Sequence, residues 1–404
     1  MELVWPGRRV GRRQRRGGIG LTEPAASRGI VLVLNAGSST LKASLVEVGG
    51  DGDIPPPIAA TTVEWGADAS RGADVQAGVA AALQRIGGEA ATAGTRAVAH
   101  RVVHGGPDFT KPTVIDEATL AAIDRLAPLA PLHNPIAAAT IRAARGLLAK
   151  VPHVAVFDTA FHATLPELAR RYPVPDGWTA WGVRRYGFHG LSVAWSVERA
   201  GQLLDRRPET LGLVVAHLGN GCSVTAVDAG RSVATSMGMT PLEGLMMGTR
   251  AGSIDPGILL LALRDRRLDA DELAEVLDHR SGLLAVSGSS SDMRELKAAA
   301  DRGDPAAALA IDMFVDRAAA GIAAAATALP RLDALVFTGG IGEHAGQVRA
   351  GVVRRLGVLG LEPVDALDDG TDRVLGGTRR GPAVLRIGAR EDVVAARGAL
   401  AAAG

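Results

Sequence analysis

The chain has very little cysteine and few aromatic residues. Cys222 is the single cysteine among 404 residues, which excludes an internal disulfide and gives no support for a zinc cluster. Aromatic residues make up only 3% of the chain although 47% of it is hydrophobic, so the core must consist of Ala, Val and Leu. No hydrophobic run reaches the length of a membrane-spanning helix. We therefore expect a cytoplasmic protein of two domains with no membrane partner.

Lysine is also scarce, because only four of the 44 basic residues are lysines. This bias towards arginine looks like genome composition rather than function. Residues 1–28 hold seven arginines and two acidic residues, which leaves residues 29–404 with a charge of about −4 and no implied basic face for nucleic acid. Residues 1–28 lack the apolar core of a signal peptide. We expect a disordered basic N-terminal extension or an early translation start; binding of nucleic acid or anionic lipid is the alternative.

The first half of the remaining chain reads as a mixed sheet with helices. Strands are expected at 31–34, 41–48, 58–65, 97–103 and 154–157, and helices at 73–86, 116–127 and 134–147. This order, written β-β-β-α-β-α-β, differs from a simple alternating β/α wind.

A similar unit begins again in the second half. An apolar strand at 211–219 is interrupted by Asn220, Gly221, Cys222 and Ser223 and then returns as a hairpin. A helical region (256–329), strands at 334–338 and 383–387, and a C-terminal helix at Glu391–Ala402 follow. The sequence thus predicts an α/β protein with duplicated halves, and duplicated halves usually face each other across a ligand-binding cleft.

Three turns rich in glycine and small polar residues occur at 35–40, 218–223 and 338–343. Such turns let backbone N–H groups approach an anion, most commonly phosphate. The chain has no GxxxxGK[ST] motif, and GGIGEH lacks the spacing of a dinucleotide fingerprint. One such turn alone would more often be a plain hairpin. Three, of which two occupy equivalent places in a repeat, favour a nucleotide phosphate held between two hairpins.

Further polar residues stand at the ends of strands and in loops. Asp158 ends a buried strand, where its carboxylate could hold Mg²⁺. For His133 and His189, each taken alone, an ordinary hydrogen-bonded or core role is the stronger interpretation. Arg250 lies in a glycine-rich loop, which seldom needs a long cation for packing, so a functional role is favoured there.

Taken in order, these segments resemble the acetate, propionate and butyrate kinase family of the actin-like ATPase superfamily. The matching segments are LNAGSSTLK, HRVVHGG, PLHNP, FDTAFH, YGFHG, HLGNG, TSMGMTPLEGLMMGTR, SGSSSD and TGGIGEH. The resemblance implies two actin-like (ribonuclease H-like) domains around a nucleotide cleft. Their expected bounds are 29–157 with 393–404 for the first, and 158–392 for the second, which would bind adenosine and form a homodimer.

The implied reaction is reversible transfer of the ATP γ-phosphoryl group to acetate, which gives acetyl phosphate and ADP. Asn35, Arg101, Asp158, His189 and Arg250 match catalytic residues, and Asn35, Asp158 and Glu391 match the ligands of Mg²⁺, or of Mn²⁺ in its place. Arg101, Val103, Leu132, His133, Phe188 and Pro241 match the acyl-binding residues. Ser38, Thr40, Lys42, His217, Leu218, Gly219, Asn220, Gly221, Asp292, Met293, Arg294, Gly339, Gly340, Ile341 and Gly342 match the nucleotide-binding residues.

The expected mechanism is direct in-line transfer. A carboxylate acceptor is already ionised at neutral pH, so catalysis needs positioning and charge neutralisation rather than a strong base. Asp158 is then expected to orient metal and water rather than to be phosphorylated itself.

Some positions depart from the family pattern. Leu191-Ser192-Val193 replaces the usual Thr-Ser-His, Gly252-Ser253 replaces Gly-Asp, and Arg390 precedes Glu391 where the family has Asn. These departures leave a catalytically impaired nucleotide-binding paralogue open as an alternative. A propionate or butyrate kinase is the other, since one extra methylene changes binding by only about 1–3 kcal/mol.

Overall fold

The computed structural model describes residues 29–37, 40–49, 56–65, 72–88, 92–366, 370–377 and 381–404. The predicted N-terminal extension and the predicted nucleotide-binding residue Ser38 lie outside these ranges.

The first half forms a six-stranded mixed sheet in the order β3-β2-β1-β4-β6-β5. Its strands are β1 (Gly29–Ala36), β2 (Thr40–Val48), β3 (Ala59–Glu64), β4 (Thr95–Val102), β5 (Thr113–Val114) and β6 (His153–Phe157). Strand β1 runs antiparallel to β2 and parallel to β4. All the predicted strands of this half are confirmed, and the short edge strand β5 is an addition.

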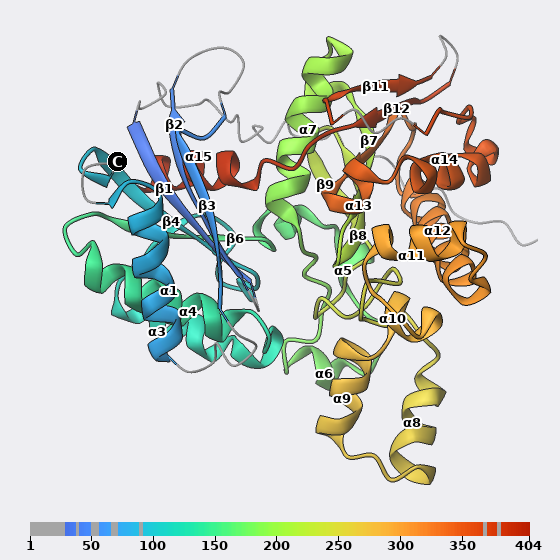
Figure 1. The fold of residues 1–404 in the computed structure, drawn as a ribbon, viewed down its shortest axis with the longest axis horizontal. Coiled ribbons are helices and arrows are strands. Elements are labelled where there is room, and N and C mark those ends of the chain that lie inside the picture. Colours follow the sequence, from blue (N-terminus) through green and yellow to red (C-terminus); the bar gives the residue numbers. More distant parts are fainter. Residues whose placement is uncertain are drawn as a thin grey trace, which may run out of the picture.

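The second half repeats this arrangement in the order β11-β12-β10-β7-β8-β9. Its strands are β7 (Gly212–Leu218), β8 (Cys222–Asp228), β9 (Arg231–Thr235), β10 (Ala334–Thr338), β11 (Arg373–Gly376) and β12 (Ala383–Arg386). Strand β7 is antiparallel to β8 and parallel to β10, as β1 is to β2 and β4. The predicted duplication is confirmed, and Figure 1 shows the two halves beside each other.

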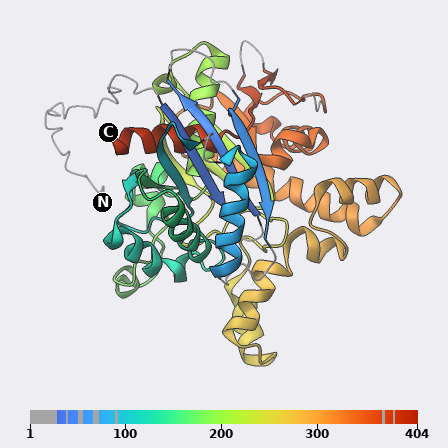
Figure 2. The same ribbon diagram turned by 60° about the vertical axis from the view of Figure 1, so that its left-hand side comes forward.

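Helices cover both sheets. They are α1 (Gly72–Arg85), α3 (Glu117–Arg125), α4 (Asn134–Leu147), α5 (Glu167–Arg170), α6 (Asp176–Thr179), α7 (Gly190–Leu204), α8 (Pro256–Asp265), α9 (Ala270–His279), α10 (Gly282–Ser287), α11 (Met293–Asp301), α12 (Pro305–Ala326), α13 (Gly339–His344), α14 (Gly346–Arg355) and α15 (Glu391–Ala403). Helices α8 and α9 project from the body of the molecule (Figures 1 and 2). No helix of the described ranges is both long enough and apolar enough to span a bilayer.

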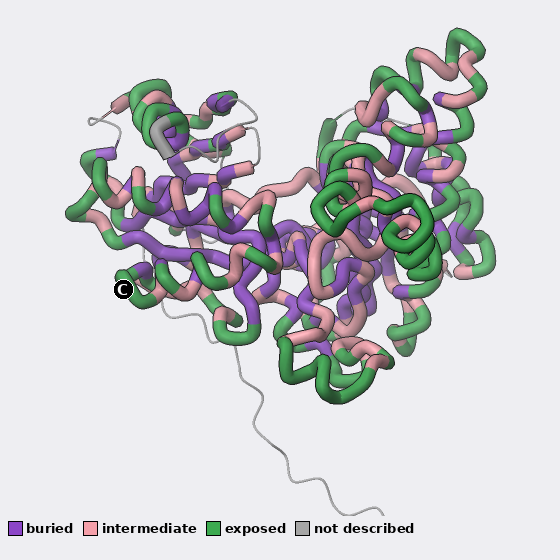
Figure 3. The backbone as a smooth tube through the Cα atoms, turned by 90° about the horizontal axis from the view of Figure 1, so that it is seen from below, coloured by how far each residue is buried: buried purple, intermediate pink, exposed green. Residues whose placement is uncertain are grey.

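Strand alternation divides the core into layers. Val31 and Val33 pack into a cluster with residues of α15 and α7, whereas Leu32 and Leu34 pack on the other face with residues of α1 and α4. Helices α7 and α15 thus lie between the two sheets and contact each other. In Figure 3 the buried segments run through both halves, and the exposed segments lie on the outside.

Two predictions for the local structure need correction. Residues 339–343, predicted as part of a third turn, form most of the short helix α13 (Gly339–His344). Gly339 has a φ of +78°, which redirects the chain from β10 into the helix, so this glycine begins the helix rather than closing a hairpin. Helix α7 was not predicted at all; it begins directly after His189, whose φ is +58°.

Candidate functional site

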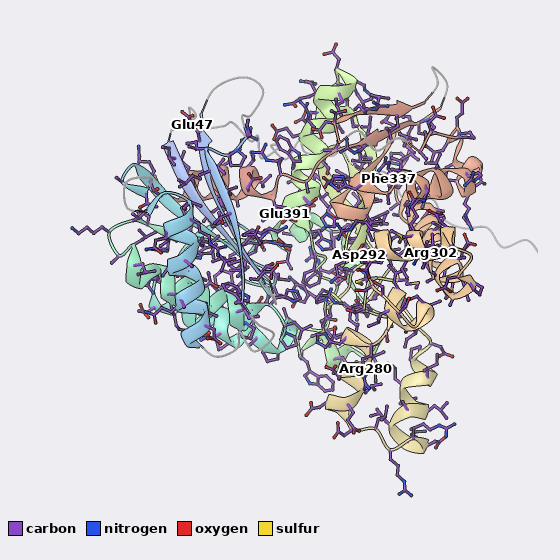
Figure 4. All side chains as sticks on the ribbon, viewed as in Figure 1. Glu47, Arg280, Asp292, Arg302, Phe337 and Glu391 are labelled. Atoms are coloured by element: carbon purple, nitrogen blue, oxygen red, sulfur yellow. The ribbon has the colours of Figure 1, made fainter. Side chains whose placement is uncertain are left out.

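A cavity of about 970 Å³ lies between the two halves. It is lined by most of the predicted site residues: Asn35, Thr40, Lys42, Arg101, Val103, His133, Asp158, Phe188, His189, His217, Gly219, Asn220, Gly221, Pro241, Arg250, Gly339, Gly340 and Glu391. Leu132, Leu218, Asp292, Met293, Arg294, Ile341 and Gly342 do not line it. Figure 4 shows Glu391 between the halves and Asp292 on the side of the second half.

Two hairpin turns reach this cavity from opposite sheets. In the first, Asn35 pairs with Lys42 across β1 and β2, so both side chains lie on one face of the sheet. In the second, the Gly219 N–H donates to the Gly221 carbonyl over 3.2 Å. A Cβ added at Gly219 would lie 3.8 Å from the Gly340 backbone nitrogen, so the start of α13 approaches the second turn. The two predicted hairpin arms therefore meet one cavity.

Arg101 connects the acidic residues of the cavity. Its Nε and Nη2 donate to the two Asp158 carboxylate oxygens over 2.9 and 2.6 Å. Its Nη1 donates to Asn35 Oδ1 over 3.1 Å and lies 3.3 Å from Glu391 Oε2. Although burial opposes the charge, the two carboxylates raise the pKa of Arg101, so its guanidinium stays ionised.

The Arg390 guanidinium is paired with a carboxylate of helix α15. Its Nε donates to Asp392 Oδ1 over 3.0 Å, so this cation is paired with the following carboxylate rather than with Glu391. Glu391 accepts instead from Asn35 Nδ2 over 3.3 Å. Burial raises the pKa of Glu391, opposed by Arg101. The departure at residue 390 therefore leaves Glu391 directed at the predicted metal ligand Asn35.

Two histidines that line the cavity stack on each other. The rings of His189 and His217 have centroids 4.1 Å apart and are inclined by 18°. Burial lowers the pKa of His189 well below its ordinary value, and burial with the nearby Arg101 lowers the pKa of His217 to about 3. Both imidazoles are therefore neutral at physiological pH.

Arg250 reaches the same point from its glycine-rich loop. Its Nη1 donates to the Pro241 carbonyl over 3.3 Å, and its Nε lies 3.8 Å from Asp278 Oδ1. A Cβ at Gly221 would lie 3.4 Å from Arg250 Nη1 and 3.6 Å from His189 Nε2. Gly221 thus keeps open a space on which a cation and an imidazole converge, which suits an anionic oxygen.

Apolar side chains line the cavity together with Arg101 and Arg250. Val103, Phe188 and Pro241 line it together with His133. Burial lowers the pKa of His133 to about 3, with Arg250 and Arg101 adding to the effect, so this ring is also neutral. The arrangement can hold a small carboxylic acid, with its apolar end against these residues.

Some of the predicted nucleotide-binding residues lie outside the cavity, although Gly339 and Gly340 line it. Asp292 caps helix α11 by accepting from the Arg294 backbone N–H over 2.8 Å. The Arg294 side chain is 89% exposed and pairs with Asp292, whereas Met293 is buried in the core. Leu218 is also buried in that core, and Ile341 packs against it.

Sequence reasoning missed four residues that support the site. Glu343 lines the cavity and accepts from the Ala389 backbone N–H over 3.0 Å, which fixes the segment before α15. Asp278 stands beside Arg250, and the hydroxyls of Ser192 and Ser223 bond the stacked histidines. Only Glu343 had a visible signal, as the one acid within the GGIGEH motif.

The oxygen atoms that line the cavity suit Mg²⁺. Asn35, Asp158 and Glu391 offer oxygen atoms, the ligands that Mg²⁺ prefers, and Mg²⁺ usually takes one or two carboxylates together with substrate phosphates and water. Within the described residues, no group of three or more His, Cys, Asp or Glu forms a protein-only cage. The two carboxylates and the amide that line the cavity fit this ion.

Comparisons with known proteins agree with this geometry. The profile described as the Acetokinase family matches residues 30–397. The chain belongs to the acetokinase family. It is 49% identical to the acetate kinase of Deinococcus deserti over 82% of this chain and 86% of that protein. It is 46% identical to the acetate kinase of Deinococcus radiodurans over 91% and 96% of the two chains.

Solved structures of the acetokinase family have the same fold. The Porphyromonas gingivalis acetate kinase gives a TM-score of 0.80 at 33% identity, over 93% of this chain and 99% of that one. A Francisella tularensis propionate kinase also gives 0.80, at 35% identity over 92% and 98%. Membership supports a kinase that uses ATP or ADP and a divalent metal. The resemblance to this family and the predicted α/β fold of duplicated halves are thereby confirmed.

Proposed function

We propose that the chain is an acetate kinase, which transfers the γ-phosphoryl group of ATP reversibly to acetate. The observation that carries this proposal is the convergence of Arg250 and His189 on the space above Gly221, in the cavity that Val103 and Arg101 also line. A phosphoryl group crossing this space would meet a cation and a neutral hydrogen-bond donor. An acetate beside Val103 would present its ionised oxygen to this phosphoryl group.

The charges suit direct in-line transfer. Acetate is ionised at neutral pH, so no general base is required, and the neutral His189 and His133 have no proton-transfer task in this step. Arg101 and Arg250 would neutralise charge on acetate and on the equatorial phosphoryl oxygens. Asp158 has both carboxylate oxygens on Arg101, which supports an orienting role over one as a phosphorylated nucleophile.

Mg²⁺ is the divalent ion that we propose. Asn35, Asp158 and Glu391 would hold it, and when bound it would supply positive charge that screens the repulsion between the phosphates. Lys42 and Thr40 from the first hairpin, and Gly219, Asn220 and Gly221 from the second, would bind the phosphate chain. Asp292, Met293 and Arg294, with residues 339–342, are proposed for the adenosine, and Ser38 for the phosphates.

Propionate is the second candidate substrate. The likeness to a propionate kinase is as strong as that to an acetate kinase, since both structures give a TM-score of 0.80. One methylene is worth about 1–3 kcal/mol in an apolar pocket, so we expect propionate to be used less efficiently rather than excluded.

A hydroxamate assay for acetyl phosphate tests the proposal. The purified chain should form acetyl phosphate only when ATP, Mg²⁺ and acetate are all present, and Arg250→Ala should abolish the activity. Turnover compared among acetate, propionate and butyrate identifies the preferred acid. Absence of any acetate-dependent turnover in folded protein would favour the impaired paralogue instead.

We also propose a homodimer formed through the second domain. Helix α8 supports it, because Ile258, Leu260, Leu261 and Leu263 are each at least 40% exposed along one short helix. Several large apolar side chains exposed on one helix are typical of an interaction surface. The proposed domain bounds are 29–157 with 393–404 and 158–392, and the packing of α15 against β1, β2, β4 and β6 supports this division. A cytoplasmic location remains a prediction that cell fractionation would test.

A further inference from the structure

Two buried serines bond the stacked histidines in a crossed pattern. Ser223 Oγ, on β8, lies 2.9 Å from His189 Nδ1, and His189 is the residue that precedes α7. Ser192 Oγ, in the first turn of α7, lies 2.8 Å from His217 Nδ1, on β7. Each histidine is therefore held by a serine of the other element. Ser223 and His217 are also direct partners across β7 and β8, which places all four side chains in one cluster.

The backbone is adapted to this cluster. His189 has φ +58° and ψ +25°, a left-handed conformation that is strained for a non-glycine residue. Gly190 is packed so closely that a Cβ there would lie 2.1 Å from the Asp158 carbonyl. A strained backbone such as that of His189 persists only where surrounding contacts over-determine it, and such strain is concentrated at functional sites. Here it accompanies the orientation of the His189 ring against His217.

The direction of the two hydrogen bonds follows from the need to satisfy the serine protons. Ser192 and Ser223 are completely buried. Among the described residues, neither hydroxyl has another partner, and the Phe188 carbonyl one helical turn before Ser192 is taken by His162 Nε2. If the Nδ1 atoms carried protons, both buried hydroxyl protons would lack an acceptor, which costs free energy. The hydroxyls therefore donate, and each Nδ1 accepts.

A neutral imidazole that accepts at Nδ1 carries its proton on Nε2. The Nε2 atoms of both rings are directed at the second hairpin turn: a Cβ at Gly221 would lie 3.6 Å from His189 Nε2, and one at Gly219 would lie 3.9 Å from His217 Nε2. Burial keeps both rings neutral by lowering their pKa values. The cluster thus presents two fixed N–H donors, side by side, to the same loop.

We propose that Ser192 and Ser223 are positioning residues that lock His217 and His189 in the Nε2–H form, so that the two rings act as a paired, uncharged donor site for anionic phosphoryl oxygens. The tautomer assignment rests on the hydrogen-bond geometry and on the burial of both rings, whereas the identity of the anion rests on the proposed function. Fixed neutral donors need no reorganisation when charge moves during transfer. The protonation of these neutral rings also does not change with pH near neutrality.

Histidine tautomers can be measured directly by long-range ¹H–¹⁵N correlation spectra of the full chain labelled with ¹⁵N-histidine. Spectra of His189→Asn and His217→Asn assign the two signals. We expect both rings in the Nε2–H form at pH 7.5. In Ser223→Ala, His189 should become a mixture of tautomers while His217 stays unchanged, and Ser192→Ala should give the reverse.

Kinetics provide the second readout. Partners that orient a functional ligand typically contribute about 10- to 100-fold in activity, so kcat should fall by that factor in each variant with little change in the KM for ATP. Ser196→Ala is the matched control, because Ser196 lies one turn further along α7, is equally buried, and its hydroxyl has no partner among the described residues. It should alter neither the spectrum nor kcat. Ser223→Cys, which is slightly larger and has a weaker donor, replaces it should Ser223→Ala fold poorly.

The proposal is overturned if either wild-type ring is Nδ1-protonated or doubly protonated, or if Ser223→Ala leaves the His189 tautomer unchanged. Tautomers as stated in a chain that lacks acetate-dependent turnover would support the serine assignment and refute the proposed function instead. The spectra need no substrate, so the two failures are distinguishable.

Discussion

Arg101 and Asp158 form a two-point ion pair at the ends of neighbouring parallel strands, with distances of 2.9 and 2.6 Å. The register of β4 and β6 sets this contact, because Val102 is paired with Phe157 and Asp158 follows directly. Asp158 is 1% exposed, so its charge depends on this partner. Removing one member of a buried pair costs about 3–5 kcal/mol because the other charge stays behind.

Arg101→Lys tests the planar two-point contact. Lysine keeps the charge but cannot bond both Asp158 oxygens and Asn35 at once. We expect kcat for acetyl phosphate formation to fall by about 100-fold or more, the effect of losing one preorganised donor. Arg142→Lys is the matched control, because that arginine is exposed and pairs with the exposed Asp124. A kcat within threefold of the wild type in Arg101→Lys would contradict the proposed role.

Glu391→Gln tests the proposed metal site. The amide retains a bond with Asn35 but removes a negative charge, so the Mg²⁺ concentration for half-maximal activity should rise about 10-fold or more, as expected for loss of a charged ligand. Glu198→Gln is the control, because Glu198 on α7 pairs with Arg397 on α15 outside the cavity. A Mg²⁺ dependence identical in all three proteins would remove Glu391 from the site.

The strands were predictable because their signal is local. Val31–Leu34 is an uninterrupted apolar run, and the similar run at 211–219 predicted the duplication from the sequence alone. Helix α13 was wrongly predicted as a turn because glycine pairs normally break helices, and only the packing of Gly339 against Leu218 shows how the chain enters one.

The site was predictable to the extent that single residues identify the family. Arg101, His189 and Arg250 came from motif matches, but their partners did not. Ser223 sits in an ordinary alternating strand, and its bond to His189 joins segments 34 residues apart. Likewise, the pairing of Arg390 with Asp392 depends on side-chain direction, which the adjacency of Arg390 and Glu391 in the sequence could not reveal.

His104 should make the fold sensitive to acid. Its Nε2 lies 3.0 Å from the Met239 carbonyl, to which it donates, and its Nδ1 accepts from the Gly106 N–H over 2.9 Å. The bond from Gly106 requires an unprotonated Nδ1 and therefore a neutral ring. Burial lowers its pKa from 6.5 to about 4. Between these values the unfolded chain binds a proton that the folded chain does not. The stabilising effect is therefore complete above pH 6.5 and is lost as the pH falls, by about 1.4 kcal/mol per pH unit.

Urea unfolding at several pH values between 7.5 and 4.5 measures this effect. The free energy of unfolding of His104→Gln should depend less steeply on pH than that of the wild type, by about 1 kcal/mol per pH unit. The exposed His279 offers the control His279→Gln, whose slope should match the wild type. Parallel slopes for His104→Gln and the wild type would show that this ring does not govern the acid response.

Val103 should limit the length of the acyl chain. It is buried, lines the cavity, and shares that wall with Phe188 and Pro241. Val103→Ala removes two methyl groups, so the ratio of kcat/KM for propionate to that for acetate should rise by about 10-fold. Val358→Ala, at an exposed position in the second half, is the control. An unchanged ratio would mean that the acyl group does not bind against Val103.

The last prediction concerns assembly. Leu261 stands in the middle of the exposed apolar residues of α8. Helix α8 belongs to the projecting part of the second half (Figure 2). If this helix forms the proposed dimer contact, Leu261→Asp would bury a charge there, and light scattering after size exclusion should change from dimer to monomer. Leu168→Asp is the control, because Leu168 is 95% exposed but belongs to the four-residue helix α5 instead. A dimer that survives Leu261→Asp would place the interface elsewhere, and a monomeric wild type would refute the dimer itself.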